Sequence, residues 1–180
     1  MGLFTAAALV FGVAATGPPV VDVCWDYGCS ERASVMLPEE GWDRIRARLY
    51  PEPPDADTER ARIADAIAEF ERVVGPLTGT DANLGGNLAG SGKEGQMDCL
   101  DESHNTSVYL QLLADHDLLR WHEPGEPERR APWIFNVHWS AVVIEKDTEQ
   151  AWVVDSWFRD NGSRPFVEQL EDWRRGAGPE

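Results

Sequence analysis

The chain has few basic residues. Its 180 residues include 16 Lys and Arg against 32 Asp and Glu, which gives a formal net charge of −16 at pH 7. A surface of this sign repels a phosphate backbone, so we expect no nucleic-acid partner. The acidic residues are spread along the chain rather than collected in a tail, which is typical of a solvated surface that keeps a protein soluble.

Long apolar runs are also scarce. The segment Leu3–Thr16, "LFTAAALVFGVAAT", is apolar and uncharged, but it is shorter than the about 20 residues that a membrane-spanning helix needs. It resembles the apolar region of a signal peptide, with small residues before a cleavage point at Thr16. We therefore predict a signal peptide over residues 1–15 and an exported protein, periplasmic or secreted, with no membrane span after cleavage. The alternatives are an N-terminal anchor and a core strand.

Cysteine is rare as well, with three residues in the chain. Cys24 and Cys29 in "CWDYGC" flank a Tyr-Gly turn, which favours a disulfide in an oxidising compartment. A zinc site would need two more ligands, and no nearby histidine supplies them. Cys99 is then the odd thiol, which marks it as reactive or intermolecular.

Patterns for other cofactors are missing. The glycine-rich stretch "GNLAGSGKEG" fails the P-loop pattern because Lys93 is followed by Glu94 instead of Ser or Thr. A metal site built from His104, His116 or His122 has no recognised ligand spacing. We therefore predict no metal and no cofactor.

The periodicity of apolar residues predicts one α+β domain over residues 16–180. Glycine and polar residues predict loops over residues 75–95 and 123–132. Two β-rich runs with a short turn between them predict an antiparallel hairpin over residues 133–145 and 150–158. Helical spacing of apolar residues predicts four helices, over residues 38–50, 57–74, 98–119 and 166–175.

Cys99 falls at the first position of the third predicted helix, with Asp98 as its N-cap. A helix N-terminus favours thiolate and can lower a cysteine pKa into the range of about 3.5–7.5. Asp98 and Asp101 oppose this through like-charge repulsion, so the thiolate needs a cationic neighbour from elsewhere.

His138 is the histidine best placed for that role. It stands in the middle of an apolar strand, where a histidine is most often a satisfied core residue. In the predicted hairpin, however, a two-residue turn puts His138 directly opposite Asp155, and a four-residue turn makes Asp155 its diagonal neighbour on the same face. Cys99, His138 and Asp155 would then supply a nucleophile, a base and a group that orients the base.

These residues resemble the transglutaminase-like branch of the papain-like superfamily. The stretch "MDCLDES" is similar to the Gly-Asp-Cys-x-Asp stretch of bacterial transglutaminase-like cysteine proteinases, and "HWSAVVIE" and "WVVDSWF" match its histidine and aspartate strands. The resemblance implies a catalytic triad of Cys99, His138 and Asp155, and a papain-like fold in which the helix that bears the cysteine packs on an antiparallel sheet, preceded by N-terminal helices. It covers residues 95–158.

The resemblance implies a thiol hydrolase or acyltransferase, that is, a protease, an amidase or a transglutaminase-like enzyme, whose partner is a peptide or protein amide substrate. The backbone N–H of Cys99 is one candidate oxyanion donor, and the Gln96 amide is a second. One alternative is a cell-wall peptidase of the NlpC/P60 family, which also has Asp-Cys at a helix start. Another is a non-catalytic binding domain that retains the fold.

Overall fold

The protein is a mixed α+β structure, which confirms the fold class expected from the sequence. A computed structural model describes residues 18–131 and 137–179, and in that part of the chain four helices accompany two antiparallel sheets. In chain order the elements are β1 (Val20–Trp25), β2 (Glu31–Met36), α1 (Glu39–Arg48), α2 (Ala56–Thr78), α3 (Cys99–Asp115), β3 (His122–Arg130), β4 (His138–Glu145), β5 (Ala151–Asp155), β6 (Phe166–Gln169) and α4 (Leu170–Arg174).

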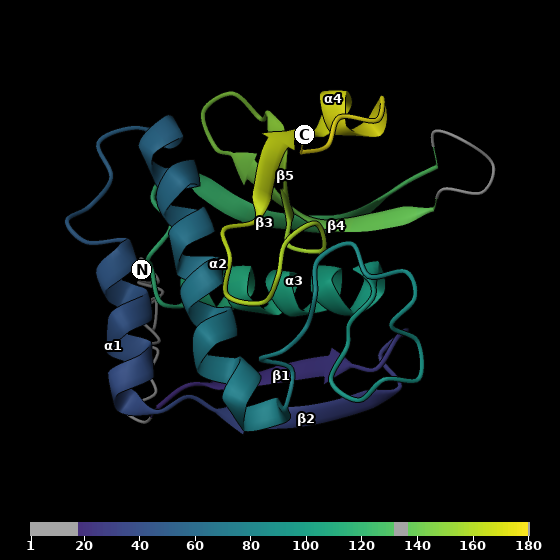
Figure 1. Ribbon diagram of the computed structural model, residues 1–180. Helices are drawn as coiled ribbons and strands as arrows, with labels where there is room; N and C mark the ends of the chain where they lie inside the picture. The colour runs from purple at the N-terminus through teal and green to yellow at the C-terminus, as the bar shows by residue number, and fades with distance from the viewer. Residues whose placement is uncertain (1–17, 132–136, 180) are drawn as a thin grey trace, which may run out of the picture.

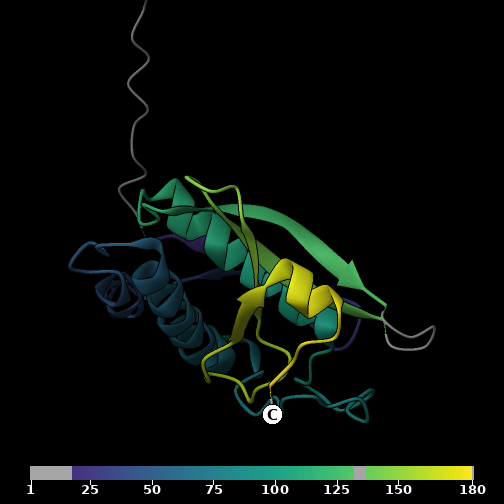
Figure 2. The same ribbon diagram turned by 90° about the horizontal axis from the view of Figure 1, so that it is seen from above.

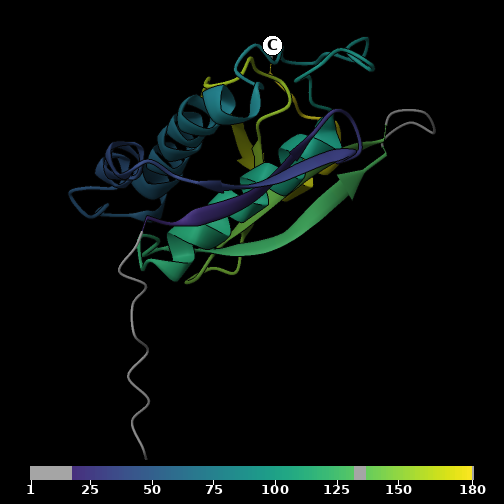
Figure 3. The same ribbon diagram turned by 90° about the horizontal axis from the view of Figure 1, so that it is seen from below.

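Helix α3 lies at the centre of the molecule. The β1–β2 hairpin packs on one side of it and the four-stranded sheet, in the order β3-β4-β5-β6, on the other (Figures 1 and 3). Helices α1 and α2 stand beside these layers, and α4 covers part of the face of the larger sheet that is turned away from α3 (Figures 1 and 2). Phe70 of α2 stacks on Tyr109 of α3 with ring centroids 4.5 Å apart, and both side chains are buried. The helix that begins at Cys99 is therefore enclosed by core on several sides.

The predicted hairpin of β4 and β5 is present, and its register decides which residues meet. Ala141 pairs with Val154, and Glu145 N–H donates to the carbonyl of Gln150 at 2.9 Å. This leaves a turn of four residues, 146–149. Of the two registers considered from the sequence, the structure has the one that makes Asp155 the diagonal neighbour of His138.

The second predicted helix begins earlier and ends later than expected. The N-cap is Asp55, and its side chain accepts the Thr58 N–H. The helix also continues past Pro76 to Thr78. A proline removes one N–H and crowds the carbonyl four residues before it, and here the helix ends two residues after the proline. Gly79, with φ of 79°, ends the helix in the left-handed conformation.

The prediction of a polar loop over residues 123–132 is wrong for most of that segment, because β3 runs from His122 to Arg130. Its prolines argue against a central strand, but β3 is at the edge of the sheet, where a missing N–H costs no ladder bond. The pairing with β4 also shifts between Gly125 and Glu128, which accommodates the irregular stretch.

Two further expectations are corrected. The final helix predicted over residues 166–175 is a strand, β6, followed by a helix of five residues, because β6 pairs with β5 and completes the sheet. The β1–β2 hairpin was not predicted as strands, although the turn between its cysteines was.

The predicted signal peptide, residues 1–15, lies outside the described residues. In the part of the chain that the structure describes, no helix is both long and apolar enough to cross a membrane.

Candidate active site

Cys99 occupies the first position of α3, as predicted. Asp98 accepts the N–H groups of Leu100 and Asp101 at 2.9 and 3.0 Å, and the Asp101 carboxylate accepts the Asp98 N–H at 3.0 Å, which completes a capping box. Cys99 is the free cysteine of the chain and is partly buried. The helix start is thus fixed by reciprocal hydrogen bonds around the thiol.

His138 and Asp155 form a buried pair. The imidazole Nε2 lies 2.7 Å from Oδ2 of the carboxylate, and the side chains are 4% and 1% exposed. A carboxylate only accepts, so Nε2 carries the hydrogen, and in the neutral imidazole the lone pair is then on Nδ1. His138 is therefore held in the tautomer that allows Nδ1 to act as a base.

Cys99 lies against the same strand. The backbone of Trp139, the neighbour of His138, interacts with the Cys99 thiol, and the Asp155 carboxylate acts on it electrostatically. Within residues 18–131 and 137–179, no hydrogen bond joins the sulfur to His138. The fold therefore brings Cys99 close to the strand that carries His138, and the imidazole–carboxylate pair is already formed on the side of the sheet where Trp173 packs.

The charge state of Cys99 differs from the sequence-based expectation. Burial raises the pKa of the thiol above its ordinary value, and the Trp139 backbone opposes this in part. The charges of Asp98 and Asp155 raise the pKa further, while the Cys99 N–H lowers it. Desolvation and nearby carboxylates therefore outweigh the helix terminus, and the resting sulfur is a neutral thiol.

Aromatic rings surround the imidazole of His138. Its ring centroid lies 4.9 Å from Trp157, 5.1 Å from Phe158 and 5.7 Å from Trp173. Trp173 is fully buried, and its indole Nε1 donates to Oδ2 of Asp155 at 2.9 Å. Trp173 falls within the helix predicted over residues 166–175, and no local pattern in the sequence indicates this contact.

Gln96 organises the loop that precedes α3. Its Nε2 donates to the Ala82 carbonyl at 3.0 Å, and its Oε1 accepts from Leu84 N–H at 3.3 Å and Asn87 Nδ2 at 2.7 Å. The side chain is buried. These bonds give Gln96 a structural function, and its part in an oxyanion hole stays a prediction.

Gly95 shows how tightly this loop is packed. Its φ is +72°, and a Cβ at this position would lie 2.1 Å from the Gly79 carbonyl oxygen. Only glycine fits both the conformation and the space.

The β1–β2 hairpin holds the N-terminus of α3 from the other side. Cys24 and Cys29 form the predicted disulfide, and residues 26–29 all have positive φ. This turn aims backbone N–H groups at two carboxylates: Tyr27 and Cys29 donate to Asp101 at 2.8 and 2.5 Å, and Gly28 donates to Asp98 at 3.0 Å. Successive N–H groups of this kind form an anion-binding nest. The Asp101 side chain is fully buried at this nest.

Two more carboxyl groups lie beneath the site. Burial and the neighbouring Glu71 raise the pKa of Glu102 well above its ordinary value, and burial raises the pKa of Glu71 to about 7. Glu71 Oε2 accepts the Gly162 N–H at 2.6 Å, Glu102 Oε1 accepts from Asn83 Nδ2 at 2.8 Å, and Glu71 Oε1 has no partner among the described residues.

The histidines considered as metal ligands are not brought together. His104 contacts the Asp22 carbonyl at 3.2 Å, His116 packs edge-on against Trp42, and His122 is buried against Glu59. Among the described residues, the one set of three potential ligand side chains within reach of each other is Cys24, Cys29 and Asp101, and both of its sulfurs are in the disulfide.

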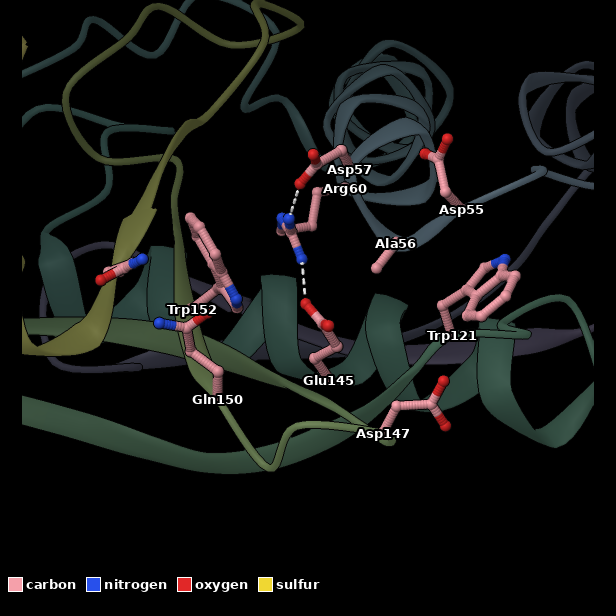
Figure 4. Close-up of a pocket in the computed structure, with 10 residues that line it drawn as sticks. Asp55, Ala56, Asp57, Arg60, Trp121, Glu145, Asp147, Gln150 and Trp152 are labelled. Atoms are coloured by element: carbon pink, nitrogen blue, oxygen red, sulfur yellow. Dashed lines mark hydrogen bonds and ion pairs between the residues drawn. The ribbon is translucent and has the colours of Figure 1, made fainter.

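A hollow of about 500 Å³ lies at the opposite end of β4 from His138 (Figure 4). Arg60 stands at its centre, between Trp152 on one side and Trp121 on the other, and bonds Asp57 and Glu145. Its guanidinium carbon is 3.9 Å from the Trp152 ring centroid. Internal ion pairs thus occupy this hollow, and none of the predicted site residues line it.

Comparison of the chain with protein-family models, with curated proteins and with solved structures found no match. The case for function therefore depends on the geometry of the site.

Proposed function

We propose that the protein is a cysteine-dependent acyl-transfer enzyme of transglutaminase-like type that acts on an amide bond. The observation that carries this proposal is the buried His138–Asp155 pair, 2.7 Å apart, at the end of the sheet where the free thiol of Cys99 lies at a helix start. Burying an imidazole–carboxylate pair is costly unless hydrogen bonds satisfy it, and a base oriented by a carboxylate is what a thiol nucleophile needs for acyl transfer.

The neutral resting thiol defines the order of proton transfers. As the Cys99 sulfur attacks the amide carbonyl carbon, its proton passes to Nδ1 of His138. The imidazolium that forms is stabilised by Asp155. When the C–N bond breaks, the same proton passes to the leaving amine and a thioester remains on Cys99. Water or an amine then attacks the thioester, and hydrolysis is the outcome we favour.

The oxyanion formed during attack needs hydrogen-bond donors. The Cys99 N–H is at the first helical position, where the α-helix provides no acceptor for it. It is therefore available to a developing negative charge next to the sulfur.

We also propose that the protein is exported. The Cys24–Cys29 disulfide supports this, because disulfides persist in oxidising compartments and are rare in reducing ones.

The test is an intact-mass search for an acyl adduct after incubation with panels of amides and activated esters. We expect an adduct of the acyl group on the wild-type protein, none on Cys99→Ala, and a strongly slowed adduct on His138→Ala. Acylation that is unchanged in Cys99→Ala would refute the proposal. A complete lack of acylation across the panels would instead support a binding domain that retains the fold.

A further inference from the structure

Trp173 is joined to the proposed site by a hydrogen bond rather than by packing alone. It lies on α4, near the end of the chain, is 0% exposed, and donates from Nε1 to Oδ2 of Asp155 at 2.9 Å. The same oxygen accepts from His138 Nε2 at 2.7 Å. Two donors from different elements thus converge on one carboxylate oxygen.

This convergence has a physical consequence for His138. Asp155 is 1% exposed, and a carboxylate removed from water is stable only when donors satisfy it. A carboxylate with a single donor can rotate about its Cβ–Cγ bond. A second donor on the same oxygen fixes that rotation, and with it the plane of the imidazole.

Arg130 holds Trp173 in place. It is the last residue of β3, pairs with His138 in the strand register and is 8% exposed. Its NH1 donates to the carbonyls of Trp173 and Ala177, each at 2.6 Å, and its guanidinium carbon is 4.6 Å from the Trp173 ring centroid. No carboxylate among the described residues bonds to it. The Asp155 carboxylate acts on it electrostatically, so Arg130 is a buried positive charge near the pair.

We propose that Trp173 is a positioning residue for the Asp155–His138 pair and that Arg130 acts through Trp173. The inference rests on the proposed function, because positioning matters for catalysis only if His138 serves as a base. It makes α4 part of the site, although Trp173 itself is fully buried and acts through Asp155.

The chain offers a matched control in Trp152. It lies on β5, the same strand as Asp155, and its Nε1 has no hydrogen-bond partner among the described residues. Trp152→Phe therefore removes an indole N–H without removing a bond, whereas Trp173→Phe removes one. Incorporation of 3-benzothienylalanine at position 173 is a second test, because it keeps the shape of indole and replaces N–H by sulfur.

The first readout is the rate of Cys99 acylation by an activated ester, followed by intact mass at several ester concentrations. For Trp173→Phe and for the benzothienyl side chain we expect the maximal rate to fall by about 10- to 100-fold, the effect of losing one hydrogen bond to a charged group. The ester concentration at half-maximal rate should stay within about twofold, because substrate binding is not altered. Trp152→Phe should retain the wild-type rate.

The second readout is the ¹H NMR resonance of the His138 Nε2 hydrogen, assigned by its loss in His138→Ala. A shortened, fixed hydrogen bond to Asp155 gives a downfield signal that should broaden or move in both position-173 variants and stay in Trp152→Phe. The inference would be overturned if the position-173 variants were acylated at the wild-type rate and their His138 signal did not move.

The two readouts separate this inference from the proposed function. If the wild-type protein is not acylated while the His138 signal still changes in the position-173 variants, the contact of Trp173 with the pair is supported and the enzyme proposal fails. If Trp173→Phe does not fold, the protein with 3-benzothienylalanine at position 173 supplies both readouts.

Discussion

Oδ2 of Asp155 accepts hydrogen bonds from both His138 and Trp173. Both hydrogen bonds require an acceptor atom at this position. An amide in its place can present NH₂ where the carboxylate presents oxygen. It would then favour the wrong imidazole tautomer, with the hydrogen on Nδ1.

We therefore expect Asp155→Asn to slow Cys99 acylation by about 10³- to 10⁴-fold, the size of the effect seen when a triad carboxylate is made neutral. The measurement is the acylation rate by intact mass at fixed pH. Asp147→Asn serves as the control, because Asp147 is an exposed residue of the turn that joins β4 to β5. A similar loss of acylation rate in Asp147→Asn would show that the effect comes from removing one negative charge from the protein, not from the contacts of Asp155.

At the scale of elements, α2 and α3 carry two buried carboxyl groups, Glu71 and Glu102, and Glu71 acts electrostatically on Glu102. Burial raises the pKa of Glu71 to about 7 from an ordinary value of 4.5. A carboxyl group whose pKa is raised by folding stabilises the fold below its unfolded pKa. That contribution is lost as the pH rises, here between about 4.5 and 7.

Glu71→Gln should therefore raise the free energy of unfolding at pH 8 by roughly 1–3 kcal/mol, and the gain should disappear near pH 4.5. The glutamine oxygen can still accept the Gly162 N–H, and its amide can donate to Glu102. Urea denaturation at the two pH values measures the difference. A variant less stable than wild type at pH 8 would contradict the assignment.

Glu69, which is also on α2, provides a control because its pKa shift has the opposite sign. Burial alone would raise its pKa, but hydrogen bonds from Arg44 and Arg48 lower it overall. A lowered pKa stabilises the fold above the unfolded value, and this contribution is lost as the pH falls. Glu69→Gln should thus destabilise the protein at pH 8, by an amount that shrinks in acid.

The β1–β2 hairpin is the element that clamps the start of α3. Its nest of N–H groups holds Asp98 and Asp101, on either side of Cys99 and Leu100, and the disulfide closes that turn. Replacing Cys24 and Cys29 together by serine should reduce the free energy of unfolding by about 2 kcal/mol, the value for a short closed loop.

The same double variant should slow Cys99 acylation, because the carboxylates next to the thiol lose their fixed donors. Thermal unfolding and the acylation rate are the two measurements. Wild-type protein treated with a thiol reductant should reproduce both changes. Unchanged acylation in both cases would mean that α3 holds Cys99 without the hairpin.

Much of the element pattern is predictable because it is local. The capping residue Asp98 and the spacing of apolar residues define α3, and alternation in β4 and β5 limits their pairing to two registers. Strand β3 was missed because its prolines are tolerated only at a sheet edge, a property of the finished sheet. The contact of Trp173 with Asp155 was missed because α4 joins the site through tertiary packing, which no spacing encodes.

At the scale of the whole molecule, net charge is the dominant electrostatic feature. The chain has 32 acidic and 16 basic residues, which gives a formal net charge of −16 at pH 7. Like charges on a compact surface repel each other. Salt weakens both this repulsion and the surface ion pairs. Exposed ion pairs contribute only about 0–1 kcal/mol each, and the acidic residues outnumber the basic ones twofold, so we expect the loss of repulsion to prevail.

Raising NaCl from 10 to 150 mM shortens the screening length from about 30 Å to about 8 Å. We expect a gain of roughly 1 kcal/mol in the free energy of unfolding, which raises the Tm by about 2–4 °C for a chain of this size. KCl at the same ionic strength should give the same shift, because screening does not distinguish the two cations. Near pH 4.5, where carboxylates begin to take up protons, the shift should shrink. A Tm that falls with salt at pH 7 would show that specific ion pairs, such as those of Glu69 with Arg44 and Arg48, outweigh the net charge.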